Sequence, residues 1–207
     1  MPKNDDLGLG LPVEIDWKQF VAIFPNWLDK PNTRVRALVD ALNKALKLIA
    51  ATTPQIAAFF IAQVGHETGN FVYDEEIASG AAYEGRKDLG NTQPGDGKRY
   101  KGRGWIQLTG RANYAAAGKA LGLPLEARPD LADDPGVACM VSAWYWNSRG
   151  LTARAIANDF ASVTLRINGG YNGWADRVRI YRRACTALGI QPLVLADTPP
   201  TPKSRKP

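Results

Sequence analysis

The chain has 207 residues, of which 45% are hydrophobic and 22% charged, as is ordinary for a single soluble globular domain. Its net charge of +6 favours anionic partners such as nucleic acid, acidic wall polymers or lipopolysaccharide, or serves solubility alone. No apolar run approaches the roughly 20 residues of a membrane span. The single histidine, His66, excludes zinc hydrolases that need two or three histidine ligands.

Residues 1–15 are predicted to be a flexible lead-in, because they contain Gly, Pro and acids without periodicity. The first residues, MPKNDD, carry acids where a secretory signal has basic residues followed by an apolar core. We therefore expect the protein to be made in a cytoplasm without a secretory signal and to act outside only after release by another agent.

Residues 16–191 are predicted to form one mainly α domain with little strand content. Apolar residues at helical spacing predict helices over 16–24, 33–49, 54–67, 111–121, 137–147, 152–158, 160–167 and 175–188. Residues 71–100 lose this period and are rich in Gly, Asn, Asp and Pro, and a loop of this length in a compact domain is usually functional. Residues 192–207 are predicted to be a Pro-rich basic tail.

The two cysteines, Cys139 and Cys185, lie within two of the apolar helical patterns. This placement favours reduced core residues over a disulfide.

The helix predicted over 54–67 has clear boundary signals. Thr52 or Thr53 can cap its start, and Pro54 suits the first helical position. Gly65 and Gly69 are expected to mark its far end.

Glu67 closes the apolar side of this helix. At about 100° per residue, one side of the helix contains Ile56, Phe60, Gln63, Val64 and Glu67. An acid on a buried face is costly to ionise, and the negative end of the helix dipole acts in the same direction. Glu67 therefore suits a general acid better than a solvated surface glutamate.

A second carboxylate opposite Glu67 would complete the acid and base pair of glycoside hydrolysis. The candidates follow in the long loop: Asp74, Glu75, Glu76 and Glu84. The alternative for the first three is a solvated acidic turn.

Segment 102–110 follows the long loop. Trp105, Gln107 and Thr109 alternate there with two apolar residues, which predicts a short extended segment between glycine turns. Gln107 and Thr109 supply hydrogen-bonding groups for a water or a sugar hydroxyl, or else belong to a half-buried strand.

Aromatic residues in the second half of the chain can stack on sugar faces, although Trp144 fits a core position better. They are Tyr100, Trp105, Tyr114, Trp144, Trp146, Tyr171 and Trp174. The glycines between 85 and 104 form no phosphate loop, because no Gly-Lys-Ser/Thr and no preceding strand accompany them. We expect no nucleic-acid partner, and no metal or organic cofactor.

Three separated motifs resemble family 19 glycoside hydrolases, and more closely their bacteriophage endolysin branch, relatives of plant chitinases that cut peptidoglycan. The motifs are QVGHETGNF at 63–71, LGNTQPGDGKRYKGRGWIQLTGRANY at 89–114 and RINGG at 166–170. The similarity extends over residues 17–188. It implies a lysozyme-like, mainly α-helical, two-lobed domain with a substrate cleft between the lobes.

The resemblance also implies roles for individual residues. Glu67 matches the general acid, and Glu76 is the best match for the base that activates water, ahead of Glu75 and Glu84. Thr109 matches the residue that helps to hold the attacking water. The implied substrate-binding and neighbouring residues are His66, Tyr100, Trp105, Gln107, Asn113, Asn168 and the basic Arg177.

Together these features predict a muralytic hydrolase that cleaves β-1,4 bonds of peptidoglycan glycan strands with inversion, made in the host cytoplasm and acting on the wall after release. A chitinase stays open, because the loop after Glu67, which carries the base, is shorter than in plant chitinases and differently composed. The chain also lacks the plant disulfide cysteines, which fits synthesis in a bacterial cytoplasm. A lytic transglycosylase, which needs one acid, and a non-catalytic basic protein that binds wall polymer or nucleic acid also stay open. A monomer is the default expectation.

Overall fold

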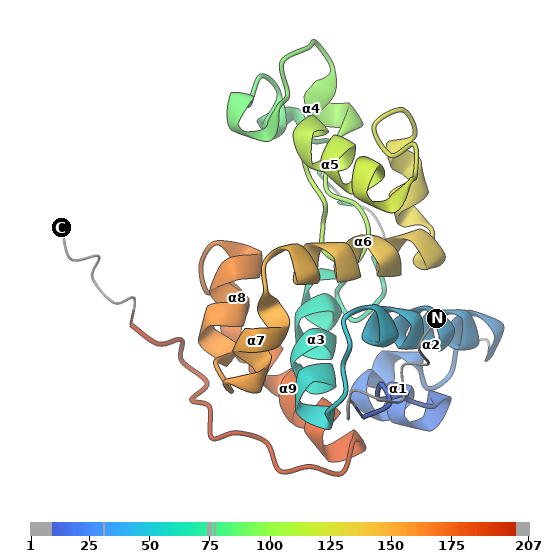
Figure 1. Ribbon diagram of the computed structural model, residues 1–207, viewed down its shortest axis with the longest axis vertical. Helices are drawn as coiled ribbons and strands as arrows, with labels where there is room; N and C mark the ends of the chain where they lie inside the picture. The colour runs from blue at the N-terminus through green and yellow to red at the C-terminus, as the bar shows by residue number, and fades with distance from the viewer. Residues whose placement is uncertain (1–9, 31, 74–75, 77, 202–207) are drawn as a thin grey trace, which may run out of the picture.

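The computed structural model describes residues 10–30, 32–73, 76 and 78–201, and within them the protein is mainly helical, as predicted (Figure 1). Strand pairing in this part of the chain is limited to one isolated antiparallel bridge, between Arg103 and Leu108. In chain order the elements are α1 (Trp17–Ile23), η2 (Pro25–Trp27), α2 (Asn32–Leu48), α3 (Pro54–Glu67), η3 (Ala81–Tyr83), η4 (Lys87–Leu89), α4 (Asp96–Arg99), α5 (Arg111–Leu121), η5 (Pro129–Asp133), α6 (Pro135–Ser148), α7 (Leu151–Ile156), α8 (Phe160–Asn168) and α9 (Trp174–Ala187).

The helices form two lobes, each with its own apolar cluster (Figure 1). The large lobe contains α1–α3 and α7–α9, and the small lobe, which contains α4 and α5, lies beyond α6. Helix α6 contributes to both clusters, with Trp146 in the large one and Val141 in the small one beside Tyr114. The two-lobed arrangement agrees with the prediction.

Helix α3 is the central helix of the large lobe. Every residue from Ile56 to Gly65 is buried, and the helix packs chiefly along α9. Thr53 begins the helix by accepting a hydrogen bond from the N–H of Ile56, and Pro54 follows it. A helix that is apolar on all sides belongs in the centre of a lobe.

The end of α3 differs from the prediction at Gly65. This residue lies inside the helix, where a Cβ would come within 2.7 Å of the Phe24 ring. The helix continues to Glu67 and ends at Thr68, after which Gly69 takes a φ of 55°. Gly65 therefore allows close packing, and only Gly69 marks the helix end.

Segment 102–110 is a tight turn, so the predicted extended segment is wrong. Arg103 and Leu108 exchange two backbone hydrogen bonds of 3.2 and 2.9 Å, and Gln107 adopts a φ of 51°. The alternating pattern gave a wrong prediction because both sets of alternating positions include buried residues, among them Trp105 at 1% exposure.

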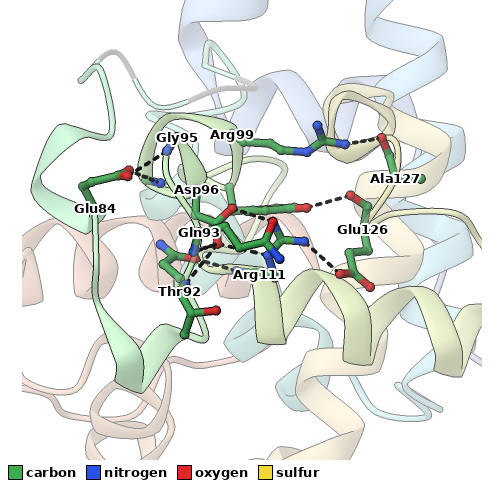
Figure 2. A network of polar contacts seen from close by, with 12 residues as sticks. Glu84, Thr92, Gln93, Gly95, Asp96, Arg99, Arg111, Glu126 and Ala127 are labelled. Carbon is green, nitrogen blue, oxygen red and sulfur yellow. Dashed lines mark hydrogen bonds and ion pairs between the residues drawn. The ribbon is translucent and has the colours of Figure 1, made fainter.

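Two carboxylates hold the chain around α4 (Figure 2). Asp96 is 1% exposed, pairs with Arg111 at 2.6 Å and accepts the backbone N–H groups of Thr92 and Gln93 at 3.1 Å. Glu84 accepts two glycine N–H groups at 2.7 and 2.8 Å. Residues 78–100 of the predicted long loop thus form an ordered series of turns and short helices.

Residues 190–201 follow α9 without forming a helix. The indole N–H of Trp174 donates to the carbonyl of Ala196 at 2.8 Å, which ties this part of the predicted tail to the large lobe. Residues 1–9 of the predicted lead-in and 202–207 of the tail lie outside the described residues.

Both cysteines are buried and free, as expected. Burial raises the pKa of the Cys139 thiol to about 11, so this side chain stays protonated. None of the helices in the described ranges combines the length and apolar character that a membrane span requires.

The Asp96 carboxylate should make the stability of the small lobe depend on pH. Bonds from Arg111 hold the pKa of Asp96 below its usual range, against the opposing effect of burial. A lowered folded-state pKa stabilises the fold above the unfolded-state pKa, and this contribution is lost as the pH falls through the folded-state value. Asp96→Asn should therefore lower the free energy of unfolding at pH 7 by about 1.5–3 kcal/mol, with a smaller difference at pH 3.

Urea unfolding at pH 7 and at pH 3 measures the loss of stability at each pH. The control is Asp88→Asn, which alters an exposed pair with Arg86 and should change the stability little. An equal loss for Asp96→Asn at pH 7 and pH 3 would contradict the assignment.

Candidate active site

Glu67, the last residue of α3, meets a buried cation from α9. A terminal nitrogen of Arg177 contacts Oε1 of Glu67, whose side chain is 17% exposed, whereas Arg177 is fully buried. Nη1 of Arg177 donates to Oε1 of Gln63 at 2.7 Å, and Nε donates to the carbonyl of Asn172 at 3.2 Å. These three contacts fix the guanidinium, which in turn positions the carboxylate.

This contact changes the electrostatic picture of Glu67 that burial alone suggests. The Glu67 carboxylate has a cationic partner as well as an apolar helix before it. Gln63 also donates to the hydroxyl of Thr164 at 3.0 Å and so links the group to α8. Glu67 therefore lies in a preorganised polar network inside an apolar lobe.

His66 forms a second pair with the start of α9. Its Nδ1 lies 2.6 Å from Oδ2 of Asp176, and Asp176 also contacts Arg179. The bond with His66 holds the pKa of Asp176 below its usual range. The imidazole ring also packs on Gly173, where a Cβ would come within 2.0 Å of it. His66 is thus oriented by the protein, and its predicted contact with substrate stays a prediction.

A second polar group surrounds Gly102 in the chain between the lobes. The Glu76 carboxylate accepts the N–H of Gly102 and the hydroxyl of Tyr83, both at 3.0 Å. A Cβ on Gly102 would lie 2.7 Å from Oε1 of Gln107, 3.2 Å from Oε2 of Glu76 and 3.4 Å from Oγ1 of Thr109. Three predicted site residues therefore present oxygen atoms to one small region.

Tyr83 keeps its proton in this arrangement. Burial raises the pKa of its phenol, and the bond to the Glu76 carboxylate raises it further. Tyr83 thus donates to Glu76, and no sequence signal had singled it out.

Hydrogen bonds within segment 102–113 position Thr109 and Gln107. The Thr109 hydroxyl donates to the carbonyl of Gln107 at 2.9 Å, and the Asn113 amide donates to the carbonyl of Thr109 at 2.7 Å. The Gln107 amide donates to the carbonyl of Gly104 at 3.1 Å. Asn113, predicted to bind substrate, therefore holds the backbone of a neighbouring site residue.

Glu84, another candidate carboxylate, does not join this group. Glu84 is exposed and accepts the N–H groups of Gly95 and Gly97 (Figure 2). Asp74 and Glu75 lie outside the described residues. Among the candidates that the structure describes, Glu76 is the carboxylate beside Gln107 and Thr109.

Asn168 shapes the loop that leads into α9. Its side-chain oxygen accepts the N–H of Asn172 at 3.1 Å, and the Asn172 carbonyl in turn accepts from Arg177. The structure thus connects Asn168 to Glu67 through Arg177, whereas a direct contact with substrate stays a prediction.

Tyr145 of α6 is affected by the charge of Glu67, and the sequence interpretation missed it. Burial raises the pKa of its phenol and the Glu67 charge raises it further, although Arg149 opposes both effects. The residue follows Trp144 in an apolar helical pattern, so no signal set it apart from core residues.

The predicted sugar-stacking role of Tyr100 and Trp105 is not supported, because each residue is only 1% exposed. Tyr100 packs on Tyr114 with ring centroids 5.5 Å apart, and Trp105 packs on Phe71 at 4.9 Å. Trp105 belongs to the apolar cluster of the large lobe and Tyr100 to that of the small lobe.

No cluster of three or more potential metal ligands from His, Cys, Asp and Glu occurs among the described residues. The site residues form two groups. The first contains His66, Glu67 and Arg177 between α3 and α9, and the second contains Glu76, Gln107, Thr109 and Asn113 around Gly102.

The packing of His66 on Gly173 is testable with a matched pair of substitutions. Gly173 and Gly169 both have positive φ, 71° and 75°, but a Cβ at Gly169 would have no neighbour within 4 Å. Both changes to alanine should lower the free energy of unfolding by the roughly 1–2 kcal/mol of a left-handed residue. Gly173→Ala should cost more, because it also collides with His66.

Urea unfolding measures the stability, and the proton spectrum of the single imidazole reports the ring directly. We expect the His66 signals to shift in Gly173→Ala and to stay in place in Gly169→Ala. Equal effects of the two substitutions would argue against the packing.

The chain is similar to several known proteins. The family model described as class I chitinase matches residues 44–158. An endochitinase of Arabidopsis thaliana is 43% identical over 145 residues, covering 67% of this chain and 50% of the endochitinase. A glycosyl hydrolase family 19 domain-containing protein of Haemophilus influenzae is 30% identical over 194 residues, covering 79% of this chain and 92% of that protein.

A solved structure shows the same arrangement of helices. Chitinase C from Streptomyces griseus superposes with a TM-score of 0.67 at 29% identity, over 90% of this chain and 96% of that chain. The chain spans about half the length of the first curated relatives that it matches. Because the family model covers more than half of its residues, the chain belongs to glycoside hydrolase family 19.

Proposed function

We propose that the protein hydrolyses the β-1,4 bonds between N-acetylated sugars in bacterial peptidoglycan, with inversion at the anomeric carbon. The observation that carries the proposal is the presence of two carboxylates in two separate polar settings. Glu67 is held against Arg177, and Glu76 is held beside Thr109 and Gln107. This difference in environment supports separate roles for the two residues, and we propose Glu67 as the acid and Glu76 as the base.

Each residue has a defined part in this reaction. Glu67, protonated when substrate binds, donates its proton to the leaving glycosidic oxygen, and Arg177 stabilises the carboxylate that results. Glu76 accepts a proton from a water that the Thr109 hydroxyl helps to hold. The water attacks from the opposite face, so a β-linked substrate gives an α product. A water between the carboxylates requires a separation of about 6.5–9.5 Å.

Peptidoglycan is the proposed substrate because the surface is basic and the wall polymer is anionic. The two cysteines are free, which suits synthesis in a reducing bacterial cytoplasm. We propose that the protein is a bacteriophage endolysin that reaches the wall after release from the host cytoplasm, as the three motifs suggest.

Chitin is the second candidate substrate. Its support comes from the relatives, since the Arabidopsis thaliana protein is an endochitinase and the Streptomyces griseus structure is that of a chitinase. A digest of chitin oligomers beside purified sacculi compares the two substrates directly.

Substitution of the carboxylates tests the mechanism. Glu67→Gln and Glu76→Gln should each lower turnover by about 10²–10⁴-fold, the usual loss when general acid or base catalysis is removed. Glu84→Gln should keep wild-type turnover, because Glu84 is committed to the N–H groups of Gly95 and Gly97. Glutamine preserves size, and circular dichroism checks that each variant folds.

The products distinguish the hydrolase from a lytic transglycosylase. We expect reducing ends that appear first as the α anomer in proton spectra of fresh digests. Anhydro ends would indicate a transglycosylase, and full activity of Glu67→Gln on both polymers would refute the catalytic assignment.

A further inference from the structure

Two cavities adjoin one another on the small lobe, with volumes of about 560 and 690 Å³. They share four lining residues: Gln93, Arg99, Arg111 and Ala127. Neither is lined by Glu67, Glu76, Gln107 or Thr109. We call this pair of cavities the small-lobe pocket, and it is separate from the candidate active site.

The lining of the small-lobe pocket is rich in cations, and part of that charge is already neutralised. Arg111 pairs with Asp96 at 2.6 Å and with Glu126 at 3.1 Å, and Arg103 lies 3.3 Å from Asp133. The acidic residue Asp130 at the rim is paired with Arg128, so it does not offset the remaining cations.

Apart from Arg103 and Arg111, the lining contains three cationic residues: Lys98, Arg99 and Lys119. Within the described ranges, no carboxylate forms an ion pair with any of them. In this part of the chain, the pocket therefore offers three positive charges that the fold does not use for pairing.

Arg99 is also held in place. One Nη donates to the carbonyl of Ala127 at 2.8 Å, and the guanidinium lies 5.6 Å from the centroid of the Tyr100 ring (Figure 2). Arg111 lies 4.8 Å from the same centroid. A guanidinium has five N–H donors, so a fixed Arg99 with one bonded donor is preorganised to bind an anion.

The other lining residues indicate which kind of anion the pocket suits. Ala115, Gly118, Leu123 and Pro124 form an apolar wall in the smaller cavity. Tyr100, the only aromatic residue of the lining in the described part of the chain, is 1% exposed and offers no face on which a nucleobase could stack. Cations beside small apolar surfaces suit a carboxylate attached to small aliphatic groups.

We propose that the small-lobe pocket binds the carboxylates of the short peptides that are attached to peptidoglycan glycan strands. This inference rests on the proposed function, because chitin is neutral and carries no such groups. Binding there would anchor the peptide-bearing strand while the candidate active site cuts its sugar backbone.

The test measures binding to sacculi in a Glu67→Gln background, so that the polymer stays intact. Lys98→Gln with Lys119→Gln removes two of the unpaired charges without touching the Arg99 contacts. The matched control is Lys44→Gln with Lys47→Gln, which makes the same change in charge on the exposed face of α2. Each chain is assayed with untreated sacculi and with sacculi whose carboxylates have been converted to neutral amides by carbodiimide coupling.

We expect the pocket variant to bind untreated sacculi about three- to tenfold more weakly than its parent, because it loses two exposed charge contacts that are each individually weak. Amidation should weaken the parent to a similar degree and have little further effect on the pocket variant. The control should retain most of the parent's affinity. Equal losses in the pocket and control variants, or a pocket variant that binds as its parent does, would overturn the proposal.

Two further measurements separate this proposal from the proposed function. Free stem peptides, released from sacculi by an amidase, should bind the parent and bind the pocket variant less well, whether or not the enzyme cuts peptidoglycan. Absence of peptide binding to the parent overturns the pocket assignment, whereas absence of reducing ends from sacculi overturns only the proposed function. Loss of duplex DNA binding in the pocket variant, with sacculus binding unchanged, would assign the pocket to phosphates and also overturn the proposal.

Discussion

The buried guanidinium of Arg177 is the constraint on which the large lobe and its chemistry both depend. Arg177 is fully buried, so the charge needs partners, and it finds Glu67 and Gln63 on α3 and the Asn172 carbonyl in the loop before α9. Breaking a buried ion pair from one side typically costs about 3–5 kcal/mol, because the other charge is left uncompensated. The same contacts therefore hold α3 against α9 and fix the position of the candidate acid. An alanine at Glu67 would test stability as much as chemistry, whereas a glutamine keeps a hydrogen-bonding partner for Arg177.

The second group depends on backbone geometry more than on charge. Gly102 leaves space for the oxygens of Glu76, Gln107 and Thr109, and Gln107 holds a φ of 51° that costs a non-glycine residue free energy. The bridge between Arg103 and Leu108 maintains this conformation. Strained backbone tends to persist where a site requires it, and here it accompanies a Gln107 side chain whose oxygen lies beside Gly102.

Local signals in the sequence were enough to predict the longer helices. They did not predict the turn conformations or the contacts between residues that are distant in the sequence. Thr53 and Pro54 begin α3 as expected, because capping is decided within one helical turn. The prediction that Gly65 marks the helix end was wrong. This position favours glycine because the Phe24 ring packs against it, and Phe24 is distant in the sequence. The pairing of His66 with Asp176 joins residues 110 positions apart, so no spacing rule predicts it. For the same reason the aromatic pattern did not show that Trp105 is buried.

In the proposed mechanism the acid and the base need to be positioned in different ways, and different parts of the fold hold Glu67 and Glu76. In the proposed mechanism the acid must reach the leaving oxygen itself, so it benefits from its place at the end of α3, where Arg177 fixes it. The base of an inverting enzyme acts through a water, which leaves more room between the carboxylates than a covalent mechanism would. Glu76 is accordingly carried by a loop, with Tyr83 and the Gly102 N–H orienting its carboxylate. In the proposed inverting mechanism this unequal support matches the two roles, because the acid contacts the leaving oxygen directly whereas the base acts through a water.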